Sequence, residues 1–172
     1  MSSLKIDYLQ HDAYSAGQLF TVCRRLRPYL GVAAELYPDF DSWFMSKTVP
    51  GLLLNERSLV FAHQGSSLAG FAILKHTQNE DKICTFCVLP SHRERGVGGK
   101  LMAACLRRFG RVMPGITVAE RLLSQFEPLL KRFGFGNPLA FFELYRRGDA
   151  EYVYDPSRRI LPTFGSGYYY RA

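Results

Sequence analysis

A cluster of glycines and cations between residues 93 and 100 has the composition of an anion-binding loop. Its sequence is RERGVGGK, with glycines at 96, 98 and 99 and cations at Arg93, Arg95 and Lys100. Glycine lacks a Cβ atom, so the backbone of such a loop can approach a ligand closely. If a helix begins here, its free N–H groups and the positive end of its dipole face the same ligand. This combination favours the binding of a phosphate or pyrophosphate group.

Two predicted elements flank this loop and would hold it in place. Residues 83–89, ICTFCVL, form a mainly apolar run typical of a buried strand, and Pro90 ends the strand because proline has no N–H group to donate. After the loop, Leu101, Cys105 and Phe109 recur at helical spacing. Strand, glycine-rich loop and helix in this order bring the start of the helix to the ligand.

Two common phosphate-binding loops do not match this segment. The dinucleotide fingerprint G-x-G-x-x-G would have its first two glycines at Gly96 and Gly98, but Leu101 takes the third position. The P-loop pattern G-x-x-x-x-G-K-[ST] would need a glycine at Glu94 and a hydroxyl residue at Leu101. Neither pattern therefore describes the loop.

The pattern that fits is Arg-x-x-Gly-x-Gly, from Arg93 to Gly98, placed directly after Val88-Leu-Pro90. Strand, proline, motif and basic helix together resemble the pyrophosphate-binding segment of the GNAT superfamily of N-acetyltransferases. A second segment, LLKRFGF at 129–135, resembles the family landmark L-Y-x-x-x-G-F. Leu130 stands where many members carry a general-acid tyrosine, and Leu123 stands where an asparagine is frequent.

The resemblance implies acetyl-CoA as the cofactor and acetyl transfer to a primary amine of an unidentified acceptor. In the family, backbone N–H groups of the central strand hold the pantetheine and the thioester, and the amides of the loop hold the pyrophosphate. Carried over by motif position, the implied cofactor-binding residues are Phe86, Cys87, Val88, Leu89, Arg93, Arg95, Gly96, Val97, Gly98, Gly99 and Lys100.

Acetyl transfer also needs groups that take a proton from the amine and return one to the thiolate. Glu120 follows a predicted short strand at 116–118 and is a candidate base; a solvent-facing carboxylate at a helix start is the alternative. Ser124 could protonate the thiolate, or it could cap a helix through the pattern Ser124-x-x-Glu127. Tyr145 is a candidate acid if the last hairpin folds over the site, and core packing is the alternative.

The four cysteines lie in apolar segments, as reduced core cysteines do. Cys84 and Cys87 have a metal-ligand spacing but no second pair, and residues three apart on a regular strand point to opposite faces. We therefore predict no metal site.

The long connection between residues 30 and 57 interleaves aromatic and acidic residues: Tyr37, Phe40, Trp43 and Phe44 with Glu35, Asp39 and Asp41. In the resembling fold this segment lies beside the acceptor entrance. An acidic and aromatic rim would attract a cationic amine by charge and by cation–π contact. Burial of the aromatics in the core is the alternative.

The predicted fold is a single α/β domain, the GNAT fold, with a mixed central β-sheet flanked by helices. Residues 1–155 would form the acetyltransferase domain, and residues 156–172 would be an aromatic, basic C-terminal extension of it. The predicted elements are a strand at 4–9, a helix capped by Ser15, a helical segment from 38, strands at 58–63 and 68–76, the central strand and its helix, a strand at 116–118, a helix to 133, and a hairpin of 139–145 with 151–154.

A net charge of +7 favours acidic partners, namely coenzyme A and possibly RNA. No apolar run is long enough to span a bilayer and the N-terminus lacks a signal-peptide pattern, so we expect a cytoplasmic protein without a membrane partner. The acceptor could be a small molecule or a protein, and the chain a monomer or homodimer. Two alternatives remain open: a toxin-type enzyme that acetylates aminoacyl-tRNA, and a catalytically silent GNAT-like binding module.

Overall fold

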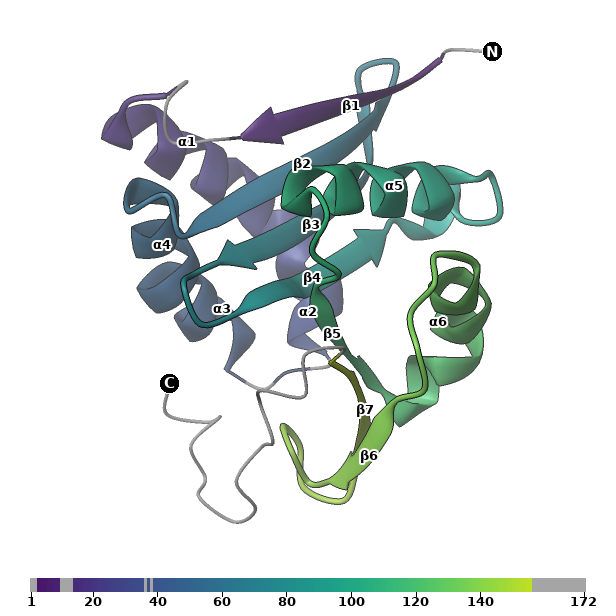
Figure 1. Cartoon of the computed structure of the whole chain (residues 1–172). Coiled ribbons are helices and arrows are strands. Elements are labelled where there is room, and N and C mark those ends of the chain that lie inside the picture. The colour runs from purple at the N-terminus through teal and green to yellow at the C-terminus, as the bar shows by residue number, and fades with distance from the viewer. Residues whose placement is uncertain (1–2, 10–13, 36, 38, 156–172) are drawn as a thin grey trace.

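The structure, a computed structural model, describes residues 3–9, 14–35, 37 and 39–155. The C-terminal extension predicted at 156–172 therefore lies outside the described residues. The described chain forms a mixed seven-stranded sheet in the order β1-β2-β3-β4-β5-β7-β6. Helices α1 to α4 cover one face of this sheet, and α5 and α6 cover the other (Figure 1). The predicted layering of a mixed sheet between helices is confirmed.

The strands are β1 (Leu4–Leu9), β2 (Arg57–Gln64), β3 (Ser67–His76), β4 (Asp81–Val88), β5 (Gly115–Ala119), β6 (Leu139–Phe142) and β7 (Ala150–Tyr154). The α-helices are α1 (Ala16–Leu26), α2 (Gly31–Ala34), α3 (Phe40–Trp43), α4 (Val49–Leu53), α5 (Val97–Phe109) and α6 (Glu120–Arg132). Single helical turns of other types are η2 (Arg27–Leu30), η3 (Phe44–Thr48) and η4 (Pro90–His92).

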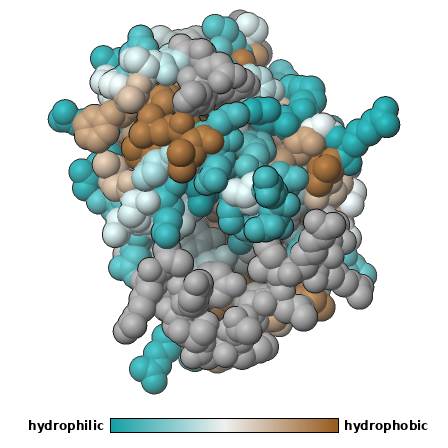
Figure 2. All heavy atoms as spheres, turned by 60° about the vertical axis from the view of Figure 1, so that its left-hand side comes forward, coloured by the Kyte–Doolittle hydropathy of each residue, from teal (hydrophilic) through white to brown (hydrophobic). Residues whose placement is uncertain are grey.

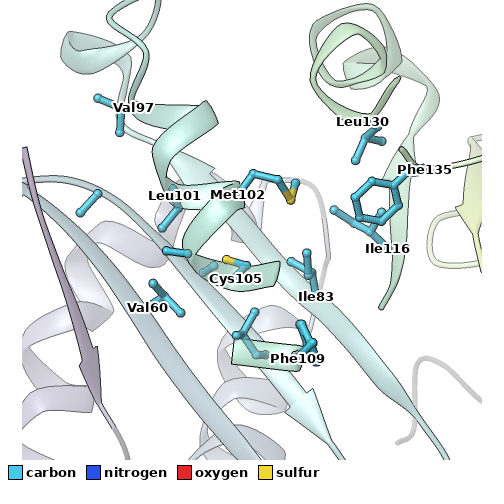
Figure 3. Close-up of a cluster of buried hydrophobic side chains, with 14 of the residues drawn as sticks. Val60, Ile83, Val97, Leu101, Met102, Cys105, Phe109, Ile116, Leu130 and Phe135 are labelled. Carbon is cyan, nitrogen blue, oxygen red and sulfur yellow. The ribbon is translucent and has the colours of Figure 1, made fainter. Parts of the chain in front are cut away.

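Each face of the sheet carries its own hydrophobic core. Between the sheet and α5 and α6, the side chains of Leu101, Met102, Cys105, Ile116 and Leu130 point into one cluster (Figure 3). The core on the other face is built from α1, α3, α4 and the opposite sides of the strands, with members such as Leu19, Phe40, Phe44, Leu52 and Phe71. The sheet is therefore buried on both sides and fixes the ends of β4 and β5 firmly.

Helix α1 begins as the sequence predicts. The Ser15 hydroxyl accepts a hydrogen bond from the Gln18 backbone N–H at 3.4 Å, and the Gln18 side chain accepts one from the Ser15 N–H at 2.8 Å. This reciprocal pair is a capping box that satisfies two amides at the helix start. The apolar stripe of Leu19, Cys23 and Leu26 is buried against the sheet.

Strand β4 contains one residue more than its neighbour β3 can pair. Ile73 pairs with Thr85 while Leu74 pairs with Ile83, so Cys84 is a β-bulge. The bulge offsets the alternation of side chains along the strand. Ile83 and Phe86 consequently lie on the α5 and α6 side, whereas Cys84 and Cys87 both lie on the side of α1 to α4.

This bulge corrects one premise of the sequence analysis. Two cysteines three residues apart would face opposite sides of a regular strand, but the bulge brings Cys84 and Cys87 to the same side. Cys84 Sγ accepts a hydrogen bond from Arg57 Nη1 at 3.3 Å. No cluster of three or more metal-ligating side chains occurs in the described ranges.

The parallel strands β4 and β5 separate soon after they begin. They pair only at Lys82 with Gly115 and at Ile83 with Ile116. Beyond these positions β5 turns to β7, with which it pairs through to Ala119. The sheet therefore opens between the C-terminal halves of β4 and β5, next to the glycine-rich loop.

The predicted cap of α6 at Ser124 is wrong. The helix begins at Glu120, directly after β5, with Ala119 as its N-cap and no side-chain cap. Ser124 therefore lies inside the helix, and Pro128 there has no N–H group to donate to the Ser124 carbonyl. Burial of the apolar face of α6 extends the helix upstream of the polar pattern that predicted its start.

The remaining surface needs only two observations. No helix in the part of the chain that the structure describes is long and apolar enough to cross a membrane. On the side of α1 and α4, an apolar patch interrupts a mainly hydrophilic surface (Figure 2). Large exposed hydrophobic residues on or next to these helices are Phe20, Leu53 and Leu54.

Candidate active site

The start of α5 presents unpaired backbone N–H groups beside the opening of the sheet. Gly96 is the N-cap residue, in the left-handed region at φ 75°, and no side chain caps the helix. The first hydrogen bond of the helix runs from the Lys100 N–H to the Gly96 carbonyl at 3.3 Å. The amides of Val97, Gly98 and Gly99 precede this bond and are the ones an anion would contact.

The space at the glycines fits a phosphate-bearing group. A Cβ atom at Gly98 would meet Val88 Cγ2 at 3.7 Å and Leu129 Cδ2 at 3.8 Å, and one at Gly99 would meet Arg132 Nη1 at 3.9 Å. The cradle is thus walled by β4 and α6, and any larger side chain would grow into it. We call the amides of 97–99 with these walls the α5 cradle.

Cations surround the α5 cradle. Arg95 and Lys100 are exposed beside it, while Arg93 Nε donates to the Val88 carbonyl at 3.3 Å and so ties the loop to the end of β4. The Arg132 guanidinium reaches the cradle from the last turn of α6. Arg132 could not be found from the sequence motif, because it lies 33 positions after Gly99 and only the packing of α6 brings it near.

The other predicted cofactor residues line β4. Phe86 lies edge-on to Phe126 of α6, with ring centroids 5.9 Å apart. Val88 packs on the same side, and Cys87 is buried on the opposite one. The Leu89 N–H donates to the Ala69 carbonyl at 2.9 Å, so this amide, expected to bind pantetheine, is already used within the sheet.

A second group of polar side chains lies on the other face of the sheet. Lys82 Nζ donates to the Tyr145 hydroxyl at 3.1 Å, and the Tyr145 ring meets Tyr37 edge-on at 5.3 Å. Glu151 of β7 completes the group, which we call the β4–β7 cluster. Its members come from β4, from the β6–β7 connection, from β7 and from the connection between α2 and α3.

Glu151 is a buried carboxyl group. Glu151 is 1% exposed, and its Oε2 atom has no hydrogen-bond donor among the described residues. Tyr152 and Tyr154 pack on the α6 side, so Glu151, directly before Tyr152 in the strand, points to the face of α1 to α4. Burial raises the pKa of Glu151 to about 7, with a further increase from Asp149.

Charged neighbours partly offset this shift. Arg121 and Lys82 both lower the pKa of Glu151, which otherwise would lie higher still. Burial and the neighbouring Glu151 raise the pKa of Tyr37, so its phenol stays protonated at neutral pH. Glu151 was predicted only as a strand residue; the available signal for a site was a carboxylate among Ala150, Tyr152 and Val153 in a strand.

The three residues predicted to act in catalysis occupy different places. Tyr145 lies in the β4–β7 cluster, as expected of a hairpin that folds over the sheet. Glu120 is exposed at the start of α6 and accepts a hydrogen bond from the Tyr152 hydroxyl at 3.5 Å. Ser124 is exposed on α6. The structure therefore brings one of the three to a buried polar site.

The acidic and aromatic residues predicted as a rim on the connection between residues 30 and 57 are only partly at the surface: Tyr37 and Trp43 are half-buried, and Glu35, Asp39 and Asp41 are exposed. Phe40 and Phe44 are buried in the core under the sheet. Asp41 accepts a hydrogen bond from Arg27 Nε at 2.8 Å, and this contact lowers the pKa of Asp41. Tyr37 is the aromatic residue of this segment that reaches the β4–β7 cluster.

A pocket of about 100 Å³ opens beside the cluster. Lys82 and Tyr145 line it together with the β3–β4 turn, the start of β5 and the end of β7. The pocket lies at the closed end of the β4–β5 pair, whereas the α5 cradle lies at the open end.

Comparison with known proteins points to one family. Residues 55–136 match the family model described as acetyltransferase (GNAT) domain, a stretch that includes β2 to α6. Among solved structures, Escherichia coli ElaA is 16% identical to this chain, with a TM-score of 0.60. The match covers 88% of this chain and 98% of the ElaA chain. No curated protein gave a match.

Two further structures share the fold. An acyl-CoA N-acyltransferase from Pseudomonas aeruginosa is 16% identical with a TM-score of 0.57, covering 89% of this chain and all of its own. The PaiA N-acetyltransferase from Thermoplasma acidophilum, solved in complex with coenzyme A, is 17% identical with a TM-score of 0.53, covering 88% of this chain and 98% of its own.

Proposed function

The chain belongs to the GNAT family of N-acetyltransferases, and on this premise we propose that it moves an acetyl group from acetyl-CoA directly to a primary amine. The observation that carries the proposal is the pairing of two features. The α5 cradle offers free amides and cations at the open end of the β4–β5 gap, and the β4–β7 cluster holds a hydrogen-bonded lysine–tyrosine pair and a buried carboxyl group on the opposite face.

The α5 cradle suits the pyrophosphate of coenzyme A. The amides of 97–99 would donate to its oxygens, while Arg95, Lys100 and Arg132 would balance its charge. Val97 is 3% exposed, so its side chain anchors the helix in the core and leaves only its amide for the ligand. Phe86, Cys87 and Val88 would border the pantetheine where β4 and β5 have separated.

Bound acetyl-CoA would supply an activated thioester, and the chain's own residues would do the rest. The gap between β4 and β5 would guide the thioester from the α5 side toward the face of α1 to α4. There Lys82 and Tyr145 form a hydrogen-bonded pair in a largely buried setting, where electrostatic effects are stronger than in water. Tyr145 is our candidate for returning a proton to the leaving thiolate.

The proposal is tested first by cofactor binding. Calorimetry at low salt should show that coenzyme A binds the folded protein in a one-to-one ratio. Absence of binding to protein that is folded by circular dichroism would refute the function and the site together.

Turnover is tested next by following thiol release from acetyl-CoA with a panel of amines, proteins and aminoacyl-tRNA. Release with a small amine or a protein supports the proposal. Transfer to aminoacyl-tRNA alone would identify the toxin-type alternative. Binding without release to any acceptor would identify a silent binding module.

A further inference from the structure

We propose that Glu151 is the proton acceptor for the amine, and that the substrate therefore enters the β4–β7 cluster as an ammonium ion. This inference rests on the proposed function, because a proton acceptor matters only if an amine is acetylated. It also assigns the charge of the acceptor, which the proposed function leaves open.

The first argument is the unsatisfied oxygen of Glu151. Buried polar atoms in folded proteins almost always have a hydrogen-bond partner, and those that lack one demand an explanation. Thr48, Ser58, Thr85 and Glu151 are the buried polar residues in the described part of the chain, and Glu151 is the carboxylate among them. An ammonium group, with three N–H donors, would satisfy Oε2 directly.

The second argument is that the nearby cations are committed elsewhere. Lys82 donates to the Tyr145 hydroxyl at 3.1 Å, and Arg121 Nη2 donates to the Glu35 carbonyl at 3.1 Å. Both influence Glu151 through charge, and Asp149 opposes them. The charge of Glu151 raises the pKa of Tyr37, which stays a neutral phenol. No described group donates a hydrogen bond to Oε2, so that atom is left for a ligand.

The third argument is the comparison with the other acidic candidates. Glu120 is exposed on α6, and Glu80 pairs with Lys75. Asp41 is paired with Arg27. The contact with Arg27 lowers the pKa of Asp41, whereas a proton acceptor works best with a pKa near the ambient pH. The pKa of Glu151, raised to about 7 by burial, meets this condition.

Access to the β4–β7 cluster would come through the pocket of about 100 Å³ that Lys82 and Tyr145 line together. Val153, which lies on the same side of β7 as Glu151, also lines this pocket. A substrate amine in the pocket would therefore approach Glu151 along β7.

The proposed acetyl transfer accounts for every proton and bond. The ammonium gives one proton to the Glu151 carboxylate and becomes a neutral amine. The amine nitrogen then forms a bond to the thioester carbonyl carbon, and the carbon–sulfur bond breaks with its electron pair on sulfur. The second proton leaves nitrogen and reaches the thiolate, with Tyr145 as the candidate relay. The products are the amide, the free thiol and protonated Glu151, which returns its proton to solvent.

The test compares two acceptors of different charge. Benzylamine is an ammonium ion at neutral pH, whereas hydroxylamine is uncharged there and needs no deprotonation before it attacks. Glu151→Gln should lower thiol release with benzylamine by about 100-fold and change release with hydroxylamine by only a few fold. Glu127→Gln, the same change on the exposed face of α6, is the matched control and should leave both rates unchanged.

A second measurement needs neither cofactor nor turnover. Infrared difference spectra of the protein alone should show a protonated carboxyl band that disappears as the pH rises through about 7, is absent in Glu151→Gln and persists in Glu127→Gln. Benzylamine should shift this titration to lower pH, because an ammonium ion favours the carboxylate.

The outcomes separate this inference from the proposed function. If Glu151→Gln retains coenzyme A binding and benzylamine turnover, or loses turnover with both acceptors equally while folded, the inference is overturned and the acetyltransferase function stands. An infrared titration in the ordinary carboxyl range also overturns it. Loss of coenzyme A binding in the unmodified protein would instead refute the proposed function itself.

Discussion

The two ends of the candidate site are built in opposite ways. The α5 cradle is centred on three consecutive backbone amides, 97–99, at the start of α5, with the exposed cations Arg95 and Lys100 beside them. The β4–β7 cluster comes from four segments between residues 37 and 151, with buried side chains as its working groups. A site formed by the backbone of consecutive residues can be recognised in the sequence. A site formed by buried side chains from distant segments is assembled only when the chain folds.

The difference extends to how each end should respond to conditions. Charges around the cradle face water, so salt screens them over about 10 Å at moderate ionic strength. The carboxyl group of Glu151 is shielded from solvent and should respond to pH more than to salt. Changes in salt concentration should therefore act mainly on the α5 cradle, and changes in pH mainly on the β4–β7 cluster.

The largest effect is expected at the cradle. Gly98→Trp adds a side chain whose Cβ atom alone would contact Val88 and Leu129, so its ring would fill the space proposed for the pyrophosphate. Coenzyme A affinity should fall at least about 100-fold, or roughly 2.7 kcal/mol, as measured by calorimetry. Gly17→Trp, at an open position on α1, is the matched control. Undiminished affinity in Gly98→Trp would show that the cradle is not the binding site.

A pH-dependent stability change is expected next, at the cluster. The pKa of Glu151 is raised from its ordinary 4.5 to about 7, so its stabilising protonated form is fully populated below 4.5 and is lost as the pH rises through 7. The unmodified protein should lose about 3 kcal/mol of stability across this interval relative to Glu151→Gln. Urea unfolding at several pH values measures the difference, and parallel pH profiles of the two proteins would contradict it.

A smaller effect is expected for Tyr145→Phe. The ring against Tyr37 remains, but Lys82 Nζ loses its hydroxyl acceptor. Stability should fall by about 1 to 2 kcal/mol, because a largely buried ammonium loses a hydrogen bond. If Tyr145 also protonates the thiolate, thiol release with benzylamine should fall at least about 10-fold at unchanged coenzyme A affinity. Equal rates in the two proteins would remove Tyr145 from the reaction.

The smallest effect is expected for Arg132→Ala. Its exposed guanidinium reaches the cradle, so coenzyme A affinity should fall several-fold, by about 1 kcal/mol at low salt, and less at high salt. Lys131→Ala removes the neighbouring cation, which pairs with Glu127 at 2.9 Å and should not affect binding. Calorimetry at two salt concentrations compares them. Equal coenzyme A affinities of the two variants at both salt concentrations would mean that α6 contributes only its overall positive charge to binding.

The parts that the sequence could predict are those set by neighbours along the chain. The capping box at Ser15, the β2–β3 hairpin and the strand–loop–helix unit around Gly96 each depend on residues a few positions apart. Their physical causes, such as a hydroxyl at a helix start or a glycine with positive φ, act over the same short range. The structure bears out these predictions to within a residue or two.

The parts that it could not predict depend on distant packing. The start of α6 follows from the burial of its apolar face, which overrode the polar pattern at Ser124. Glu151 became a candidate only through its burial in β7, between β5 and β6, and through its charge interaction with Tyr37. The extra residue at Cys84 carries no sequence signal at all, because a bulged strand has the same composition as a regular one.

That extra residue makes position 84 a place where β4 can change its length without changing its faces. Thr85 pairs with Ile73 and Ile83 with Leu74, so deleting Cys84 would restore regular pairing with β3 and leave Ile83 and Lys82 on their present sides. Deleting a residue from the regular stretch 86–88 would instead exchange the faces of the residues before it. The lineage of this protein should therefore accept a deletion at Cys84 more readily than one nearer the end of β4.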